Sequence, residues 1–170
     1  MQTWTALVGE TPAMLTRRYR VLLAAILGLL GLQFLLGMLA NLFVTVPTAH
    51  PGAHAGEYFS GVAQDVVWAL GNAVAALRLH VIVGALLFLA ALWLLVLAIA
   101  ARRRGRIVVA SVGLFAIWAA GMNGASFMNY YEDFSSLIMA LGFLVAAVAY
   151  VIGYGMREES STSQLRRTTR

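Results

Sequence analysis

The chain has 170 residues, of which 61% are hydrophobic and 11% are charged. A soluble domain carries charge at about a quarter of its positions, because its surface faces water. The apolar residues here run in stretches as long as a bilayer is thick. The composition excludes an ordinary water-soluble domain and predicts an integral membrane protein.

The formal net charge of +5 comes from twelve cationic side chains, all of them arginines. Eleven lie in three short segments that flank apolar stretches: residues 17–20, 102–106 and 157–170. This placement indicates contact with anionic lipid headgroups, and no nucleic-acid partner is predicted. The chain has no cysteine, which excludes disulfides, zinc fingers and iron–sulfur clusters held by its own thiolates.

Residues 1–20 are predicted to form a short interfacial segment that ends at an arginine cluster. The first membrane span is predicted over residues 21–44. Its glycines, Gly28, Gly31 and Gly37, are expected to let a neighbouring helix approach closely. Gln33 is the strongly polar side chain near its middle, so it is expected to make an interhelical hydrogen bond or to line a site.

Pro47 and Pro51 break the helix and open the one sizeable loop, within which residues 57–70 are amphipathic at helical period. One side carries Tyr58, Phe59, Val62, Ala63, Val66 and Leu70, and the other carries Glu57, Ser60, Gln64 and Asp65. We expect a helix that lies on the outer membrane surface. It would cover the mouth of the bundle, with partner docking or substrate gating as the alternative role.

Three more spans are predicted over residues 77–101, 107–125 and 135–156, followed by a disordered cytoplasmic tail over residues 157–170. The predicted fold class is all-α, an integral membrane four-helix bundle in which residues 21–156 form the transmembrane domain. Because positively charged loops resist translocation, both termini are expected in the cytoplasm, in a plasma or inner membrane.

The edge of the second span and the neighbouring turns carry a polar rim made of Arg78, Asn123, Asn129 and Asp133. Arg78 is expected to pair with Asp65, Glu132 or Asp133 and so to hold the outer loops over the bundle. The rim could also bind a small ligand or a lipid headgroup, and closing the helical hairpin explains its asparagines equally well.

The outer loop contains His50, His54 and Glu57. Two imidazoles and a carboxylate are a ligand set for zinc, copper or iron. Pro51 and Gly52 prevent helical spacing between the histidines, so these side chains could instead cap the following helix or face solvent.

His80 lies at the edge of the second span, where a neutral imidazole is a ligand for haem b or a metal. A second axial ligand could come from Met139, or from Met122 or Met128, although methionine in a membrane helix usually packs. No Asp, Glu or Lys lies at mid-membrane, so the sequence does not predict proton pumping or ion-coupled transport by this chain alone.

The segments Leu79-His80-Val81-Ile82-Val83-Gly84 and Ser136-Leu137-Ile138-Met139-Ala140-Leu141, with the arginine-rich turn between them, resemble one four-helix half of haem A synthase. In that family a histidine at each of two helix openings ligates haem. His80 matches the first position, and Gly142 stands at the second. Leu77 stands where the family has a glutamate, and the outer-loop cysteine pair of many members is absent. The resemblance implies a degenerate or single-ligand relative.

Since no complete set of catalytic residues is present, the sequence favours a non-catalytic subunit, scaffold or assembly factor of a membrane complex. The expected partners are the lipid bilayer and other membrane subunits or further copies of the chain. A haem-binding protein with His80 as axial ligand is the alternative, and a lipid or small-molecule permease component is a third possibility.

Overall fold

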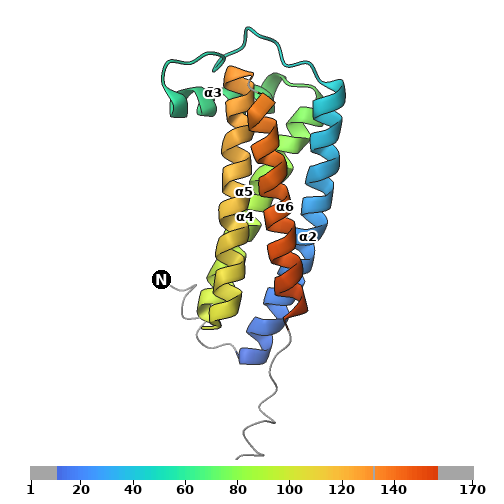
Figure 1. Cartoon of the computed structure of the whole chain (residues 1–170), viewed down its shortest axis with the longest axis vertical. Helices are drawn as coiled ribbons and strands as arrows, with labels where there is room; N and C mark the ends of the chain where they lie inside the picture. Colours follow the sequence, from blue (N-terminus) through green and yellow to red (C-terminus); the bar gives the residue numbers. More distant parts are fainter. Residues whose placement is uncertain (1–10, 132, 157–170) are drawn as a thin grey trace, which may run out of the picture.

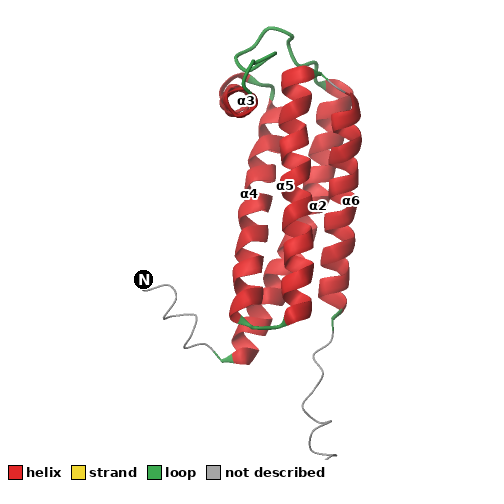
Figure 2. Cartoon of the chain, turned by 60° about the vertical axis from the view of Figure 1, so that its left-hand side comes forward, coloured by secondary structure: helices red, strands yellow, loops and turns green. Residues whose placement is uncertain are grey.

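The computed structural model of the chain describes residues 11–131 and 133–156, and these residues form five helices without a strand. Four helices are long: α2 (Pro12–Phe43), α4 (Ala75–Ala100), α5 (Arg104–Tyr130) and α6 (Asp133–Gly155). They run side by side as a bundle (Figures 1 and 2). The short helix α3 (Tyr58–Asn72) lies beside the bundle near one end, roughly perpendicular to the long helices, and contacts α4 and α5 (Figures 1 and 2).

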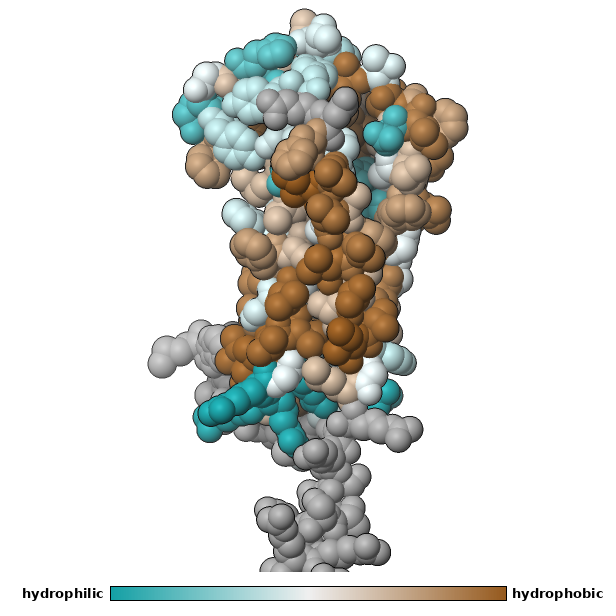
Figure 3. Space-filling model, viewed as in Figure 1, coloured by the Kyte–Doolittle hydropathy of each residue, from teal (hydrophilic) through white to brown (hydrophobic). Residues whose placement is uncertain are grey.

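All four long helices are long and apolar enough to cross a membrane, since a span needs about 20 apolar residues. Apolar side chains cover the visible flank of the bundle between its two polar ends (Figure 3). The predicted all-α, four-helix membrane bundle is therefore confirmed. The chain is a multi-pass membrane protein, and the amino end of α2 and the carboxyl end of α6 lie at the same end of the bundle (Figure 1).

The first helix begins at Pro12, although the sequence placed the start of the span at residue 21. Proline is favoured in the first helical turn, because its fixed φ suits a helix and its missing N–H has no partner there anyway. No residue between Pro12 and Val21 stops the helix, so Arg17, Arg18 and Arg20 lie within it.

Helix α5 continues to Tyr130, five residues beyond the predicted end of the third span. Two polar side chains on either side of residue 125 bond back to carbonyls of their own helix and so need no partner outside it. Asn123 Nδ2 donates to the Ala119 carbonyl at 2.8 Å, and Ser126 Oγ donates to the Met122 carbonyl at 3.1 Å. Tyr131, in the left-handed conformation with φ 58°, then ends the helix.

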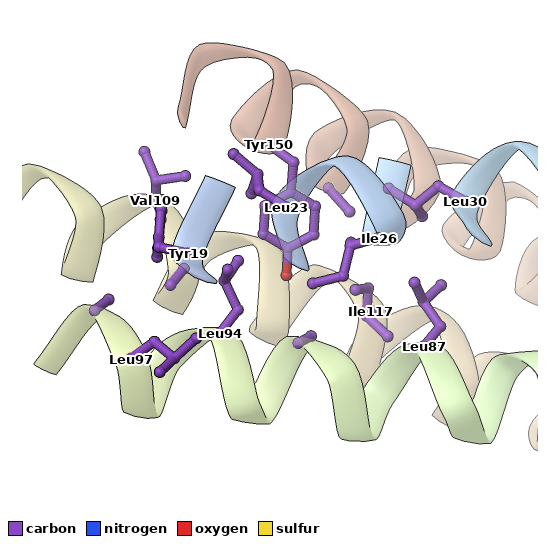
Figure 4. Packing of buried hydrophobic residues seen from close by; sticks show 14 of the residues in the cluster. Tyr19, Leu23, Ile26, Leu30, Leu87, Leu94, Leu97, Val109, Ile117 and Tyr150 are labelled. Carbon is purple, nitrogen blue, oxygen red and sulfur yellow. The ribbon is translucent and has the colours of Figure 1, made fainter. Parts of the chain in front are cut away.

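Side chains from all four long helices form one core, in which Leu23 and Ile26 of α2 lie close to Leu94 of α4 and Tyr150 of α6 (Figure 4). The contact between α5 and α6 depends on glycine. A Cβ on Gly113 would overlap the Tyr150 ring, and a Cβ on Gly142 would lie 2.8 Å from the Ala116 carbonyl oxygen. Small residues at these positions let the two backbones approach closely.

The predicted amphipathic helix is present over Tyr58–Asn72, but the prediction that Asp65 lies on its water-facing side is wrong. Asp65, placed with the water-facing residues by its polarity, is completely buried against the bundle together with Gly61 and Ala69. Phe59 and Val67 are instead 69% and 71% exposed. The carboxyl group of Asp65 points inward because it bonds His50, a partner that helical periodicity does not reveal.

Candidate functional site

The polar groups gather in what we call the cap, which consists of residues 44–57 and helix α3 and lies at the end of the bundle opposite the arginine-rich end. At its centre, His50 Nε2 lies 2.9 Å from Asp65 Oδ1, and neither side chain has exposed surface. The Trp68 ring packs against the imidazole, with 4.5 Å between centroids. A buried acid and base therefore join the loop to α3.

The hydrogen bonds around His50 fix one of its protons. The Pro47 carbonyl oxygen lies 2.7 Å from His50 Nδ1 and 2.6 Å from the Tyr131 hydroxyl. A carbonyl oxygen only accepts, so Nδ1 carries a hydrogen and donates it. The remaining proton lies between Nε2 and Asp65, as imidazolium with aspartate or as imidazole with aspartic acid. Both forms make a neutral pair.

The pKa of Asp65 is raised above its ordinary value because burial disfavours the charged carboxylate. The hydrogen bond and charge of His50 oppose this shift. The pKa of Tyr131 is also raised, by burial first and by the nearby Asp65 second. Both shifts favour the neutral forms of the acids at the centre of the cap.

Asn129 of α5 fastens the loop to the bundle. Its Oδ1 accepts from the Ala55 N–H at 3.2 Å, and its carbonyl accepts from the His54 N–H at 3.0 Å. The side chain is completely buried, and a Cβ on Gly61 would overlap its amide nitrogen. Glycine at position 61 thus lets α3 lie directly on Asn129.

Two further contacts hold the ends of α3. The Tyr58 hydroxyl lies 2.9 Å from Ser126 Oγ and donates to the Met122 carbonyl at 3.1 Å. Arg78 Nη2 donates to the Gly71 and Ala73 carbonyls at 3.2 and 3.1 Å. A cation at the carboxyl end of a helix satisfies free carbonyls and complements the helix dipole.

The predicted polar rim does not form one site around Arg78. Arg78 bonds the end of α3, Asn129 bonds the loop, and Asn123 bonds its own helix. The predicted partner Asp65 is paired with His50. Glu132 and the side chain of Asp133 lie outside the described part of the structure.

The three candidate metal ligands of the loop have separate roles. His50 bonds Asp65, and the exposed His54 lies beside Tyr131, with 5.8 Å between ring centroids. Glu57 caps α3, because its carboxylate accepts from the Phe59 and Ser60 N–H groups at 3.1 and 2.6 Å. Within residues 11–131 and 133–156, no group of three or more His, Asp or Glu could hold a metal ion.

His80 lies in the contact between α2 and α4, where its Nε2 is 3.2 Å from Gln33 Nε2. This is the interhelical hydrogen bond expected of Gln33. The packing is reciprocal: a Cβ on Gly37 would lie 3.0 Å from His80 Cε1, and one on Gly84 would lie 3.1 Å from Gln33 Nε2. His80 therefore packs on Gly37, one turn after Gln33, and Gln33 packs on Gly84, one turn after His80.

The residues present do not fit a haem at His80. The coordinating Nε2 atom is held by Gln33, and the ring is packed against the α2 backbone at Gly37. Met139 lies in the contact between α5 and α6, where its sulfur is 3.1 Å from the position that a Cβ on Gly124 of α5 would take. At Gly142, the family's second ligand position, even a Cβ would press on the backbone of α5.

Sequence reasoning did not identify Asp65, Trp68 and Tyr131 as partners of His50, because loop turns rather than periodicity bring them together. One signal was present in α3. Gly61, Asp65 and Ala69 recur every four residues, and all three are buried. Small residues one turn before and after a polar residue are typical of a face in close contact with another helix.

Comparisons of the chain with protein-family models, with curated proteins and with solved structures find no match.

Proposed function

We propose that the chain is a non-catalytic subunit, scaffold or assembly factor of a membrane complex. One observation carries the proposal: five polar side chains in or against the cap each bond another of the five or the backbone, and these bonds hold the cap closed. His50, Asp65, Asn129, Arg78 and Glu57 all act in this way. Such a network orders a surface, as a docking module requires.

The surface so ordered is the outward side of α3. Phe59, Val67 and Leu70 are exposed there, on a helix fixed by contacts along its length. An exposed apolar group on a polar background is a common feature of protein-binding surfaces. We propose that this row binds an apolar surface of a partner subunit.

The proposal includes the orientation in the membrane. The described arginines other than Arg78 lie at the end of the bundle away from the cap, and positively charged segments stay in the cytoplasm. The cap then faces the outside of a plasma or inner membrane, and both termini are cytoplasmic.

Blue-native electrophoresis of mildly solubilised membranes tests the docking role with two matched double variants. Phe59→Ala with Val67→Ala alters the α3 row, and Phe115→Ala with Val108→Ala removes the same two residue types from the flank of α5, at 66% and 61% exposure. The wild type and the α5 variant should migrate as a complex larger than one chain. The α3 variant should migrate as the isolated chain.

The proposal is wrong if the wild type migrates as a single chain even after cross-linking in the membrane, or if both variants lose the complex equally. A visible spectrum of the same wild-type preparation tests the haem alternative. It should show no Soret band. A strong band that disappears in His80→Ala would overturn the proposal in favour of a haem protein.

A further inference from the structure

A second feature lies at the other end of the bundle and is independent of the proposed docking role. Helices α2 and α4 leave an open groove of about 670 Å³ between them. Arg17, Arg18, Val21 and Ala25 of α2 line it together with Trp93 and Leu97 of α4. Its volume lies in the range of small-molecule sites, about 300–1,000 Å³.

Arg17 and Arg18 lie toward one end of the groove beside the apolar Met14, and the rest of the lining is apolar. Arg17 and Arg18 stand at the arginine-rich end, and from there to Ala25 the helix rises about 12 Å at 1.5 Å per residue. Val21, Ala25 and the half-exposed Trp93 follow toward the middle of the bundle. A ligand that fits this sequence of surfaces has an anionic head and an apolar chain.

The neighbouring arginines of this end face other groups. Arg20 lies over the Tyr154 ring, 5.3 Å from its centroid, and so joins α2 to α6. Arg106 lies over the Tyr19 ring at 5.0 Å and donates to Thr16 Oγ1 at 3.1 Å, which joins α5 to α2. These two side chains therefore join α2 to α6 and to α5.

We propose that this groove binds an anionic phospholipid. Arg17 and Arg18 contact the phosphate, and one acyl chain lies along Val21 and Ala25 against Trp93. Two guanidinium groups supply several N–H donors for phosphate oxygens. The apolar wall removes the acyl chain from contact with mobile lipid. A free phosphate has no apolar part that could contact this wall.

Native mass spectrometry of the full chain in mild detergent tests the headgroup contacts. Phosphatidylglycerol should remain bound to the wild type in preference to phosphatidylcholine. Arg17→Gln with Arg18→Gln should reduce phosphatidylglycerol retention by about thirtyfold, since each of the two arginines near anionic lipid contributes about 1 kcal/mol. The matched control, Arg103→Gln with Arg104→Gln, removes two exposed charges at the same end outside the groove and should keep the wild-type retention.

Two further measurements test the acyl contacts. Ala25→Trp fills the groove without changing charge and should also reduce retention, and an excess of glycerol phosphate or inorganic phosphate should not displace the lipid. The proposal fails if both double variants reduce retention equally, because diffuse charge then explains the binding. It also fails if glycerol phosphate competes as well as the whole lipid, or if Ala25→Trp has no effect.

Discussion

At the scale of single residues, the buried pair of His50 and Asp65 dominates the cap. A lone buried charge is costly, but an acid and a base that share one proton stay neutral as a pair. The Pro47 carbonyl fixes the second imidazole hydrogen, and Trp68 covers the ring. The pair therefore joins loop and helix without placing a net charge in the interior.

The raised pKa of Asp65 predicts the direction of a pH effect. A carboxyl group that holds its proton more tightly in the closed cap than in the open one favours closure at low pH. This contribution is fully present below the ordinary pKa of about 3.9 and is lost as the pH rises through the raised value. Cap closure should therefore become less favourable as the pH rises across this window.

Asp65→Asn should abolish this dependence while keeping a hydrogen bond to His50. Fluorescence of Trp68 can report cap opening, because the indole stacks on the imidazole, once Trp4, Trp93 and Trp118 have been replaced by phenylalanine in every variant compared. Glu57→Gln is the control, since it removes an exposed carboxyl group from the amino end of the same helix and should keep the wild-type slope. An unchanged slope in Asp65→Asn would assign the effect to another group.

At the scale of helices, glycine determines which pairs approach closely. On α5, Gly113 lies under the buried Tyr150 ring, whereas a Cβ on Gly121 would have no atom within 4 Å. Between α2 and α4, Gly37 and Gly84 instead receive the polar side chains of the opposite helix. The same residue type therefore serves an apolar contact in one place and a polar one in the other.

Gly113→Ala and Gly121→Ala form a matched pair on one helix. Alanine favours the helix by about 1 kcal/mol over glycine at both positions. At Gly113 the added methyl group overlaps a ring that is buried and cannot move away, so a net loss of about 1–3 kcal/mol is expected. Gly121→Ala should be neutral or stabilising. Reversible unfolding in mixed micelles measures both values, and equal stability of the two variants would contradict the close contact.

The sequence predicts the four spans well and the cap only in part, for a physical reason. Spans are encoded locally by apolar length, and Gln33, a lone polar residue in such a stretch, had to find a partner, which is His80. The cap depends on turns around Pro47 and Gly52, which bring His50 to Asp65 from fifteen residues away. No periodic pattern encodes that contact, and polarity alone placed Asp65 on the wrong side.

At the scale of the whole molecule, the distribution of charge sets the proposed orientation. Four antiparallel spans bring the amino ends of α2 and α5, with their arginines, to one end, and the cap lies at the other (Figure 1). Arginine in short segments next to spans resists translocation, while Glu57 and Asp65 of the cap do not. The bundle should therefore insert with the cap outside.

Single cysteines test this orientation cleanly, because the chain has none of its own. Ser60→Cys lies on the exposed side of α3, and Thr11→Cys lies at the exposed start of α2. Neither substitution changes the arginine pattern. In intact cells an impermeant maleimide should label Ser60→Cys alone, and Thr11→Cys should react only after the membrane is opened. The reverse result would invert the bundle and place the cap in the cytoplasm. Labelling of both positions in intact cells would contradict the placement of cap and amino-terminal end on opposite faces.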